Sequence, residues 1–489
     1  MASTTSAPAA HAAPTTFADP TPDPIPTVPL PVPKPSAPYW LSEPDAFLEN
    51  HRTTPELPAY ADVVVVGSGL TGANAARYLG EEGKGLRVVM LEAREACSGA
   101  TGRNGGHLQP LLLERPPSVA HFELRNCTTL GTLITSHSIP CAYQPRPSIR
   151  TYWQPPAFAA ATAELAELRT KDPDLAGRMQ ALTSPEDLAA WAVKPECVGA
   201  IRTEGAAAVW PYKLIAWMLR REIEVGRLNL QTSTPVTSLA PYSGDKPGAR
   251  WSLSTPRGAI TARHVLLATN AWTAHLLPQF AGLIVPVRET MSALIPPPAM
   301  PPLNGTYGFV GLGPAVGFAD DYLVQLPPQD NGLLMFGGGR GAGVEGSVGE
   351  ADDAVVDAGC VDYLRRSLGE ALALGVEGDL EAKSAWSGIW AASRDGRPWV
   401  GGVPRQDGVW LAGAYSGHGM PNGALCARAV VRMILGSEAG EEPDSVVEGL
   451  VSRGDLPESY VLTPERMEAA QRVDSVWIQG VKGPVRLKE

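Results

Sequence analysis

The chain has 489 residues, of which 44% are hydrophobic and 19% are charged, as is usual for a globular protein of two or three domains. Its formal net charge of −11 argues against a nucleic-acid-binding protein, because such proteins usually present a basic face to phosphates. No apolar run reaches about 18 residues, so we predict no transmembrane helix.

Six cysteines are spread along the chain without the C-x-x-C spacing of zinc sites and redox motifs. We therefore predict no metal site and interpret most of the cysteines as small buried hydrophobic residues in a reducing compartment. This favours a soluble, cytoplasmic protein. The six are Cys97, Cys127, Cys141, Cys197, Cys360 and Cys426.

The first forty residues are rich in proline, alanine, serine and threonine. Repeated proline prevents a regular helix and favours extended, solvated chain. A basic start, a continuous apolar stretch and arginine are all missing, which argues against a secretory signal or a mitochondrial transit peptide. We predict a disordered tail over residues 1–40, with a targeting or docking segment as the alternative.

A glycine motif follows the first predicted strand, "ADVVVV". Gly67, Gly69 and Gly72 form G-x-G-x-x-G at the start of a predicted helix. In a dinucleotide-binding unit these glycines permit the tight turn, the approach of a pyrophosphate to the backbone and close packing of helix on strand. Glu92 ends the next apolar strand, where a carboxylate would accept hydrogen bonds from ribose hydroxyls. We predict dinucleotide binding, against the alternative of a purely structural glycine turn.

The choice of dinucleotide depends on charge and on a second glycine-rich patch. Glu92 repels a 2′-phosphate, which disfavours NADP and leaves NAD and FAD. The patch "CSGATGRNGGHL" contains Gly99, Gly102, Gly105 and Gly106, so a bulky planar ring can lie against bare backbone there. This favours FAD.

Further along, the pattern alternates helices, strands and turns. Residues 163–192 predict helices broken at Pro173 and Pro185, and a helix is expected after Pro211, a residue favoured at helix starts. The other expected elements are strands over 228–239 and from 264, a β-hairpin over 322–340 with Asp330, Asn331 and Gly332 in its turn, a strand over 408–417, a helix over 423–436 and an irregular extension over 441–489.

The segment "SGATGRNGGH" resembles the FAD-dependent oxidoreductase family that includes D-amino-acid oxidase, glycine oxidase and sarcosine oxidase. The resemblance is strongest to its γ-glutamylputrescine-oxidase-like branch, which has many fungal members. Segments 204–239, 265–273, 387–404 and 411–436 are similar to further motifs of the family, in matching order.

The resemblance implies an α/β fold: a Rossmann-like, GR2-type FAD domain with three-layer β/β/α organisation, and an α+β substrate domain built on an antiparallel sheet. We expect the FAD domain at 41–115, 201–285 and 381–440, the substrate domain at 116–200 and 286–380, and a C-terminal extension at 441–489. Some relatives attach FAD through a cysteine in the C-terminal motif. "SAWSGIW" has none, so we expect non-covalent FAD.

From the two glycine patches and the resemblance we assign a set of residues to cofactor binding. They are Gly67, Gly69, Leu70, Thr71, Gly72, Glu92, Ala93, Arg94, Ser98, Gly99, Ala100, Thr101, Arg103, Asn104, Gly105, Gly106, His107, Val236, Thr269, Asn270, Trp272, Gly388, Gly417, His418, Gly419 and Met420.

The activity that the resemblance implies is oxidation of a C–N bond by hydride transfer to flavin N5, giving an imine that hydrolyses, with O2 as the usual acceptor. Glycine-oxidase-like members carry a carboxylate-binding arginine at the position of Trp390. Tryptophan cannot form that bidentate pair, so we expect an amine substrate that is polyamine-derived or secondary. We assign Trp390, Tyr415, His418 and His107 as catalytic candidates.

Aromatic walls would disfavour the ammonium form by desolvation or bind a cationic amine through cation–π contacts. Besides Trp390 and Tyr415, the candidates are Trp272, Trp386 and Trp399.

Three alternatives stay open. An amino-acid oxidase would need a relocated carboxylate clamp at Arg288, Arg340 or Arg394, although Arg394 fits better in a turn with Asp395 and Gly396. The other two are an amine dehydrogenase of specialised metabolism and a flavoprotein scaffold without turnover. The oligomeric state is left open.

Overall fold

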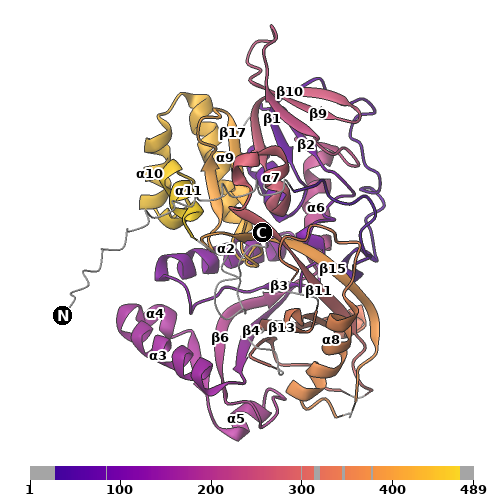
Figure 1. Cartoon of the computed structure of the whole chain (residues 1–489), viewed down its shortest axis with the longest axis vertical. Helices are drawn as coiled ribbons and strands as arrows, with labels where there is room; N and C mark the ends of the chain where they lie inside the picture. Colours follow the sequence, from indigo (N-terminus) through magenta and orange to yellow (C-terminus); the bar gives the residue numbers. More distant parts are fainter. Residues whose placement is uncertain are drawn as a thin grey trace, which may run out of the picture.

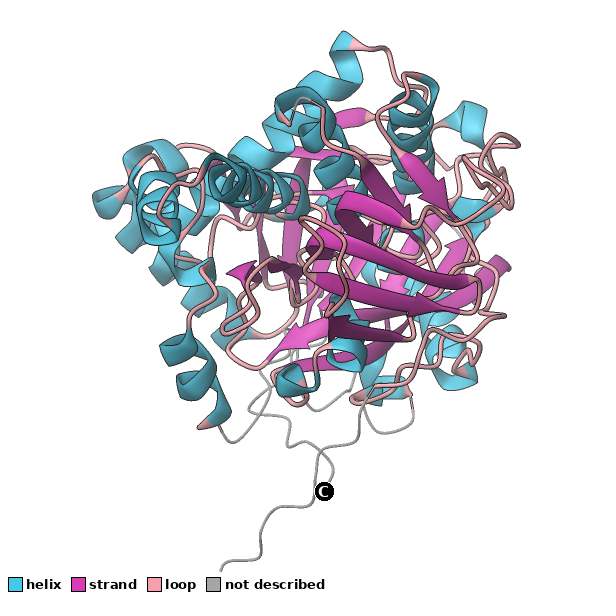
Figure 2. Cartoon of the chain, turned by 90° about the horizontal axis from the view of Figure 1, so that it is seen from above, coloured by secondary structure: helices cyan, strands magenta, loops and turns pink. Residues whose placement is uncertain are grey.

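The computed structural model describes residues 28–83, 85–298, 300–312, 320–343, 347–375 and 378–473. Within these ranges the strands form an eight-stranded sheet and a nine-stranded sheet, in the upper and lower halves of Figure 1. Figure 2 shows helices around the periphery of both sheets. The predicted α/β fold with an additional sheet is confirmed.

The first sheet has a parallel core in the order β17-β10-β1-β2-β7, with β16 antiparallel at one edge. Every residue of β1 is buried, as expected for a parallel strand covered on both faces. The strands are β1 Tyr60–Val66, β2 Val88–Leu91, β7 Asn229–Gln231, β8 Ser238–Pro241, β9 Trp251–Thr255, β10 Gly258–Leu267, β16 Trp399–Gly402 and β17 Val409–Gly413.

Three helices cover one face of this sheet: α1 (Leu70–Glu82) packs against both α6 (Pro211–Glu224) and α9 (Gly423–Ala439). Strands β8 and β9 continue antiparallel from β10 as a separate meander. Helix α6 begins at Pro211 as predicted. The single strand predicted over 228–239 is wrong, because β7 and β8 are separate strands on either side of Pro235.

The second sheet has the order β15-β11-β14-β13-β12-β4-β6-β3, with β5 paired to β6. All of its pairs are antiparallel except β4 with β12. The strands are β3 His107–Leu108, β4 Gln144–Tyr152, β5 Met179–Leu182, β6 Gly199–Ala208, β11 Ile284–Leu294, β12 Thr306–Val310, β13 Asp320–Gln325, β14 Leu334–Gly338 and β15 Ala382–Ser393.

The predicted hairpin is confirmed as β13 and β14. Its turn has Asn331 and Gly332 in the left-handed region, at φ 70° and 61°. The remaining helices are α2 Pro117–Ser136, α3 Pro155–Lys171, α4 Pro173–Ala176, α5 Pro185–Ala189, α7 Thr273–Leu276, α8 Ala358–Ala371, α10 Pro443–Ser452 and α11 Pro464–Gln471. Helices α4 and α5 begin at the two prolines that we predicted as breaks, and β5 lies between them.

The sheets divide the chain differently from our expected domain ranges. Strands β3, β6 and β15 lie in ranges assigned to the FAD domain, yet they pair within the second sheet. The physical reason is the long antiparallel pairing of β11 with β15, which bridges the expected boundary at residues 380–381. The domain boundaries themselves stay a prediction.

The predicted terminal segments need correction where the structure describes them. Residues 28–40 are not a free tail, because Val28, Tyr39 and Trp40 are buried in the hydrophobic cores; residues 1–27 lie outside the described ranges. The extension after 441 is not irregular. It forms α10 and α11 and buries Leu450 and Tyr460, whereas residues 474–489 again lie outside.

All six cysteines are buried and unpaired, which agrees with our interpretation of them as small hydrophobic core residues. Among the described residues, no cluster of histidine, cysteine, aspartate or glutamate side chains has the arrangement of a metal site. Across the same ranges, every helix is too short or too polar to cross a bilayer.

Candidate active site

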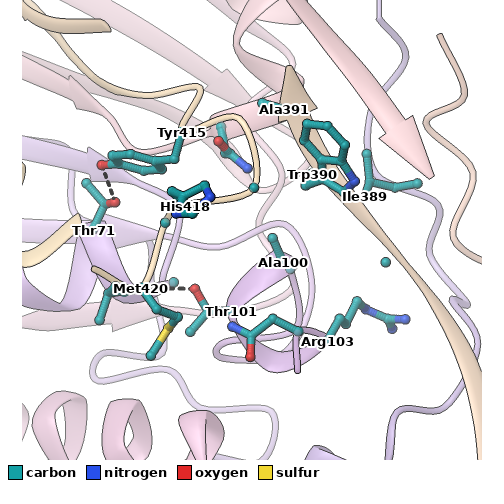
Figure 3. A pocket seen from close by; sticks show the side chains of 18 of the residues that line it. Thr71, Ala100, Thr101, Arg103, Ile389, Trp390, Ala391, Tyr415, His418 and Met420 are labelled. Carbon is teal, nitrogen blue, oxygen red and sulfur yellow. Dashed lines mark hydrogen bonds between the residues drawn. The ribbon is translucent and has the colours of Figure 1, made fainter. Parts of the chain in front are cut away.

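A cavity of about 360 Å³ runs from the start of α1 to the second sheet. It is lined by the turn after β1, the end of β2, the second glycine patch, the loop before α9, and strands β11, β13 and β15. Figure 3 shows part of it, with Trp390 on one side and Tyr415 and His418 on the other.

The turn between β1 and α1 brings bare backbone to the cavity. Gly67 has a φ of +105°, and a Cβ there would lie 2.7 Å from the carbonyl oxygen of Ala268. At Gly72 a Cβ would lie 1.9 Å from the Gly67 carbonyl oxygen, so only glycine lets the helix pack this closely on the turn. Helix α1 has glycine at its N-cap position, which supplies no side-chain cap, and no acidic residue in its first turn. Its N-terminus is therefore suited to a phosphate group.

The Glu92 carboxylate is held in a fixed orientation at the end of β2. One oxygen accepts hydrogen bonds from the Ser68 N–H (3.0 Å) and hydroxyl (2.6 Å), and the other accepts from the Arg94 N–H (2.9 Å). The oxygen that accepts from Arg94 keeps a further lone pair for a ribose hydroxyl. Val236 and Trp272 line the cavity beside this carboxylate.

The second glycine patch crosses the middle of the cavity. The Thr101 hydroxyl accepts a hydrogen bond from the Leu70 N–H at 3.0 Å, which ties the patch to the start of α1 (Figure 3). A Cβ at Gly99 would meet only open space. At Gly105 a Cβ would lie 2.6 Å from the Tyr322 ring, so the missing side chain makes room for that aromatic.

The loop before α9 closes the opposite side. The Tyr415 hydroxyl lies 2.8 Å from the Thr71 hydroxyl (Figure 3), and burial raises the pKa of Tyr415 well above its usual range. Asn126 of α2 donates to the Met420 carbonyl and accepts from the Leu425 N–H, both at 2.9 Å. Asn422 donates to the His418 carbonyl at 2.9 Å. Through Asn126, helix α2 therefore fixes a loop on which five of our candidate residues lie: Tyr415, Gly417, His418, Gly419 and Met420.

Most residues that we assigned to the cofactor or to catalysis line this cavity. Gly72, Ser98 and Gly106 do not: Gly72 packs α1 on the turn, and the other two act through their backbone. Those that do line it are Gly67, Gly69, Leu70, Thr71, Glu92, Ala93, Arg94, Gly99, Ala100, Thr101, Arg103, Asn104, Gly105, His107, Val236, Thr269, Asn270, Trp272, Gly388, Trp390, Tyr415, Gly417, His418, Gly419 and Met420.

Two of the assigned arginines have a structural task. The Arg94 guanidinium pairs with the fully buried carboxylate of Asp353 at 2.9 Å, and that of Arg103 lies 3.3 Å from the same carboxylate. Arg103 also donates to the carbonyls of Ser36 and Ser387. Burial lowers the pKa of Arg103 to about 10, so the guanidinium stays charged at neutral pH.

His107 lies against the Tyr322 ring, with the ring centroids 5.7 Å apart and the planes at 86°. Burial lowers the pKa of His107 to about 4, so the imidazole is neutral at pH 7. Among the atoms that the structure describes, its Nε2 is buried without a partner. A neutral imidazole of this kind offers one hydrogen-bonding nitrogen to a ligand in the cavity.

Beyond Trp390, the second sheet and the turn after β14 supply charged side chains to the cavity: Arg340, which we considered as a carboxylate clamp, and Glu289, Arg150 and Asp320, which we did not assign. Arg340 donates to Glu289 at 2.8 Å, and its guanidinium carbon lies 5.2 Å from the Trp390 ring centroid. Arg150 pairs with Asp320 at 3.2 Å. The side chains of both pairs are at least three-quarters buried.

Two of the candidate aromatic walls and two of the candidate clamps lie outside the cavity lining. Trp386 and Trp399 are fully buried core residues outside the cavity lining. Arg288 donates to the Asp352 carbonyl, because alternation along β11 turns it away while Glu289 lines the cavity. Arg394 donates to the carbonyl of Val473, next to a turn with Gly396 as we expected.

Comparison with known proteins agrees with this geometry. The family described as FAD dependent oxidoreductase (DAO) matches residues 62–433, which is most of the chain. The chain belongs to the FAD-dependent oxidoreductase family. It is an enzyme, and FAD is its cofactor.

Several relatives of this FAD-dependent oxidoreductase are similar over most of their length. A probable oxidoreductase OrdL of Rhizobium meliloti is 24% identical over 413 residues, which cover 78% of this chain and 87% of the relative. A glycine oxidase of Pseudomonas aeruginosa is 26% identical over 393 residues, which cover 78% of this chain and 95% of the relative.

Two solved structures share the fold. Glycine oxidase from Geobacillus kaustophilus has a TM-score of 0.65 at 20% identity, covering 83% of this chain and 99% of the other. L-amino acid deaminase from Proteus vulgaris has a TM-score of 0.62 at 17% identity, and the match covers 82% of this chain and 96% of the other.

The residues present fit FAD. The start of α1, with glycine at its N-cap position, and the bare turn at Gly67 suit the pyrophosphate, and the Glu92 carboxylate suits the adenosine ribose. The second patch, open at Gly99, and the loop over residues 417–421 suit the ring system. When bound, FAD supplies the capacity to accept a hydride from the substrate.

The oxidoreductase site also contains residues that our sequence reasoning did not assign. For the second sheet a signal exists, because period-two alternation places Glu289 with Met291 on one face of β11 and Asp320 with Tyr322 on one face of β13. Others, such as Ser68 and Pro421, directly adjoin residues that we assigned, whereas Leu30, Arg150 and Tyr307 have no such local signal. The lining residues that we did not assign are Leu30, Pro31, Val66, Ser68, Leu91, Gln109, Pro110, Leu111, Arg150, Ala268, His275, Leu276, Glu289, Met291, Tyr307, Gly308, Asp320, Tyr322, Ile389, Ala391, Ser416 and Pro421.

Proposed function

We propose that this enzyme oxidises a C–N bond of a polyamine-derived or secondary amine that carries no free carboxylate beside the reacting nitrogen. The observation that carries the proposal is the ion pair between Arg340 and Glu289, at 2.8 Å, in the cavity lining. An arginine binds a carboxylate most strongly through two parallel hydrogen bonds. Here one edge of the guanidinium is already given to Glu289, and its charge is neutralised.

The chain's own side chains favour an amine in three ways. The Trp390 and Tyr322 rings line the substrate end of the cavity, and a desolvated surrounding favours the neutral, reactive form of an amine over the ammonium. The Glu289 carboxylate accepts hydrogen bonds from amine N–H groups. Asp320, paired with Arg150, leaves no net positive charge at this end to attract an anion.

The proposal includes non-covalent FAD, O2 as acceptor and a relation to γ-glutamylputrescine-oxidase-like enzymes. Non-covalent binding is supported by Cys97, which follows the Glu92 strand but is fully buried and absent from the cavity lining. Burial also raises the pKa of the Cys97 thiol above its usual range, which disfavours the reactive thiolate.

The test is an anaerobic substrate screen, followed by measurement of peroxide in air. We expect N-alkylated amines and putrescine derivatives to bleach the flavin absorbance, and glycine and other free amino acids to leave it unchanged. Glu289→Gln should lower kcat/KM for the amine by about ten- to a hundredfold, because a charged hydrogen-bond acceptor contributes roughly 1.5–3 kcal/mol. Glu350→Gln, at an exposed position, is the matched control.

A second candidate is oxidation of an amino acid, with Arg340 as the relocated clamp. It is favoured by the place of Arg340 in the cavity lining, next to Trp390, and by the names of the glycine oxidase and deaminase relatives. Bleaching by amino acids alone, with a KM raised by Arg340→Lys, would establish this candidate in place of the amine. Bleaching by neither class would favour a scaffold.

A further inference from the structure

We propose that residues 28–36, the N-terminal strap, are part of the FAD site and slow the release of FAD by covering its adenosine end. The strap precedes the stretch that matches the family, which begins at residue 62. The inference rests on FAD dependence and is independent of the substrate.

The adenosine end of the cavity is marked by Glu92. A carboxylate at the end of the second strand of such a unit hydrogen-bonds the ribose next to the adenine. The Glu92 carbonyl accepts a hydrogen bond from the Thr234 N–H at 2.8 Å, which brings Val236 to the same place. The Arg94 guanidinium lies 5.7 Å from the Trp272 ring centroid, so Trp272 belongs to this end as well.

The first half of the strap crosses this end. Leu30 and Pro31 line the cavity together with Val236, Trp272 and His275. Val28 is buried against the core of the first sheet, and its carbonyl accepts a hydrogen bond from His275 Nδ1 at 3.1 Å. Two apolar side chains therefore close the cavity where the adenine would lie.

The second half of the strap is anchored at Ser36. The Ser36 N–H and hydroxyl both donate to the Asp353 carbonyl, at 2.8 and 2.7 Å. The Ser36 carbonyl accepts from Arg103 at 2.8 Å, and its hydroxyl accepts from the Ser387 N–H at 3.1 Å. These partners lie 67 or more residues from Ser36 in sequence and meet around Asp353, whose buried carboxylate pairs with Arg103.

The two attachments explain how the strap would retain the cofactor. Opening the adenosine end requires the strap to lift, which breaks the Ser36 hydrogen bonds and exposes Leu30. Local opening of this kind has its own free-energy cost, and that cost adds to the barrier for FAD release. Of the strap, only Leu30 and Pro31 line the cavity, and the flavin end is lined by other residues, such as Trp390 and His418. We therefore expect the strap to act on the adenosine end.

The test uses the full-length holoenzyme and the variants Leu30→Ala, Ser36→Ala and the double variant. FAD release is followed as the increase in flavin fluorescence after dilution. Each single variant should release FAD about three- to tenfold faster, the range that one hydrogen bond or a partly buried side chain supplies. Lys34→Ala, at an exposed position of the strap, should not change the rate.

Measuring how tightly the deflavinated protein rebinds its ligands distinguishes a specific loss of FAD retention from a general loss of fold stability. We expect the double variant to lose affinity for FAD and for ADP as a probe, and to bind FMN as the wild type does. An unchanged release rate in the double variant would overturn the proposal. So would an equal loss of FMN and FAD affinity, because the strap would then stabilise the fold and not the adenosine site.

Discussion

For single residues, the active site depends on positions where adding one atom, such as a Cβ at Gly67 or a proton on His107, would disturb the fold or the cavity. Gly67 combines a φ of +105° with a neighbouring carbonyl oxygen only 2.7 Å from where a Cβ would be. His107 is an ionisable ring that burial keeps neutral. In both cases the constraint comes from residues distant in sequence: Ala268 beside Gly67, and Tyr322 beside His107.

Gly67→Ala should abolish FAD binding. The alanine must either adopt a strained backbone or push against the Ala268 carbonyl, which also lines the cavity. We expect purified protein with less than about a tenth of the wild-type flavin, which corresponds to a loss of at least ~1.4 kcal/mol of binding free energy. The ratio of flavin absorbance to protein absorbance measures this flavin content. Gly369→Ala, a helix position with normal Cβ contacts in α8, is the control and should keep full flavin content.

His107 should make the protein less stable in acid. Its pKa is about 4 when folded and about 6.5 when unfolded, so the unfolded state binds the proton first. Its contribution is therefore complete above pH 6.5 and is lost as the pH falls toward 4, by on the order of 2 kcal/mol. Urea unfolding at pH 7 and pH 5 should show a smaller difference for His107→Gln than for the wild type. His137→Gln, at an exposed position, should behave as the wild type; an equal acid effect in all three proteins would contradict the prediction.

At the scale of elements, helix α2 and the loop before α9 form a unit. Asn126 takes the capping task at the start of α9, because the N-cap residue Asn422 makes no side-chain cap of its own. Asn422 instead donates to the fully buried Glu123 and accepts from the Tyr460 hydroxyl, and burial raises the pKa of Glu123. The segment after residue 441 thus supports the loop from behind.

Asn126→Ala should loosen that loop. It leaves the Leu425 N–H and the Met420 carbonyl without this partner, at a cost of about 1–3 kcal/mol for each buried group. We expect a lower unfolding midpoint together with a shifted flavin absorption band, since the loop lines the cavity. Thr128→Ala on the exposed side of α2 provides the comparison. A lower midpoint with an unaltered flavin spectrum would mean that α2 supports the fold but not the flavin environment.

At the scale of the whole molecule, the cavity joins two sheets whose strands alternate along the chain. Its walls include the turn after β1 from one sheet and β11, β13 and β15 from the other. A ligand in this position contacts both halves, so it stabilises their arrangement as well as its own site.

Removal of FAD should therefore lower the thermal unfolding midpoint of the entire chain. A ligand that binds only the folded state at a hundred times its Kd adds about 2.7 kcal/mol. Calorimetry of holo and deflavinated protein should give one cooperative transition for the holoenzyme, at a midpoint that rises with added FAD. Two separate transitions in the presence of saturating FAD would contradict the view that the cofactor couples the sheets.

The cofactor end of this site was predictable from the residues alone, because its parts are local: a strand, a glycine turn, a helix start and an acid follow one another within residues 60–92. The hairpin turn and the proline-started helices were predictable for the same reason. The substrate end and the strap become apparent only in the folded chain. Glu289, Asp320 and Arg340 come from three separate strands and turns, and Ser36 meets Asp353 across 317 positions. Such pairings depend on sheet register and core packing, which the spacing of residues along one chain does not encode.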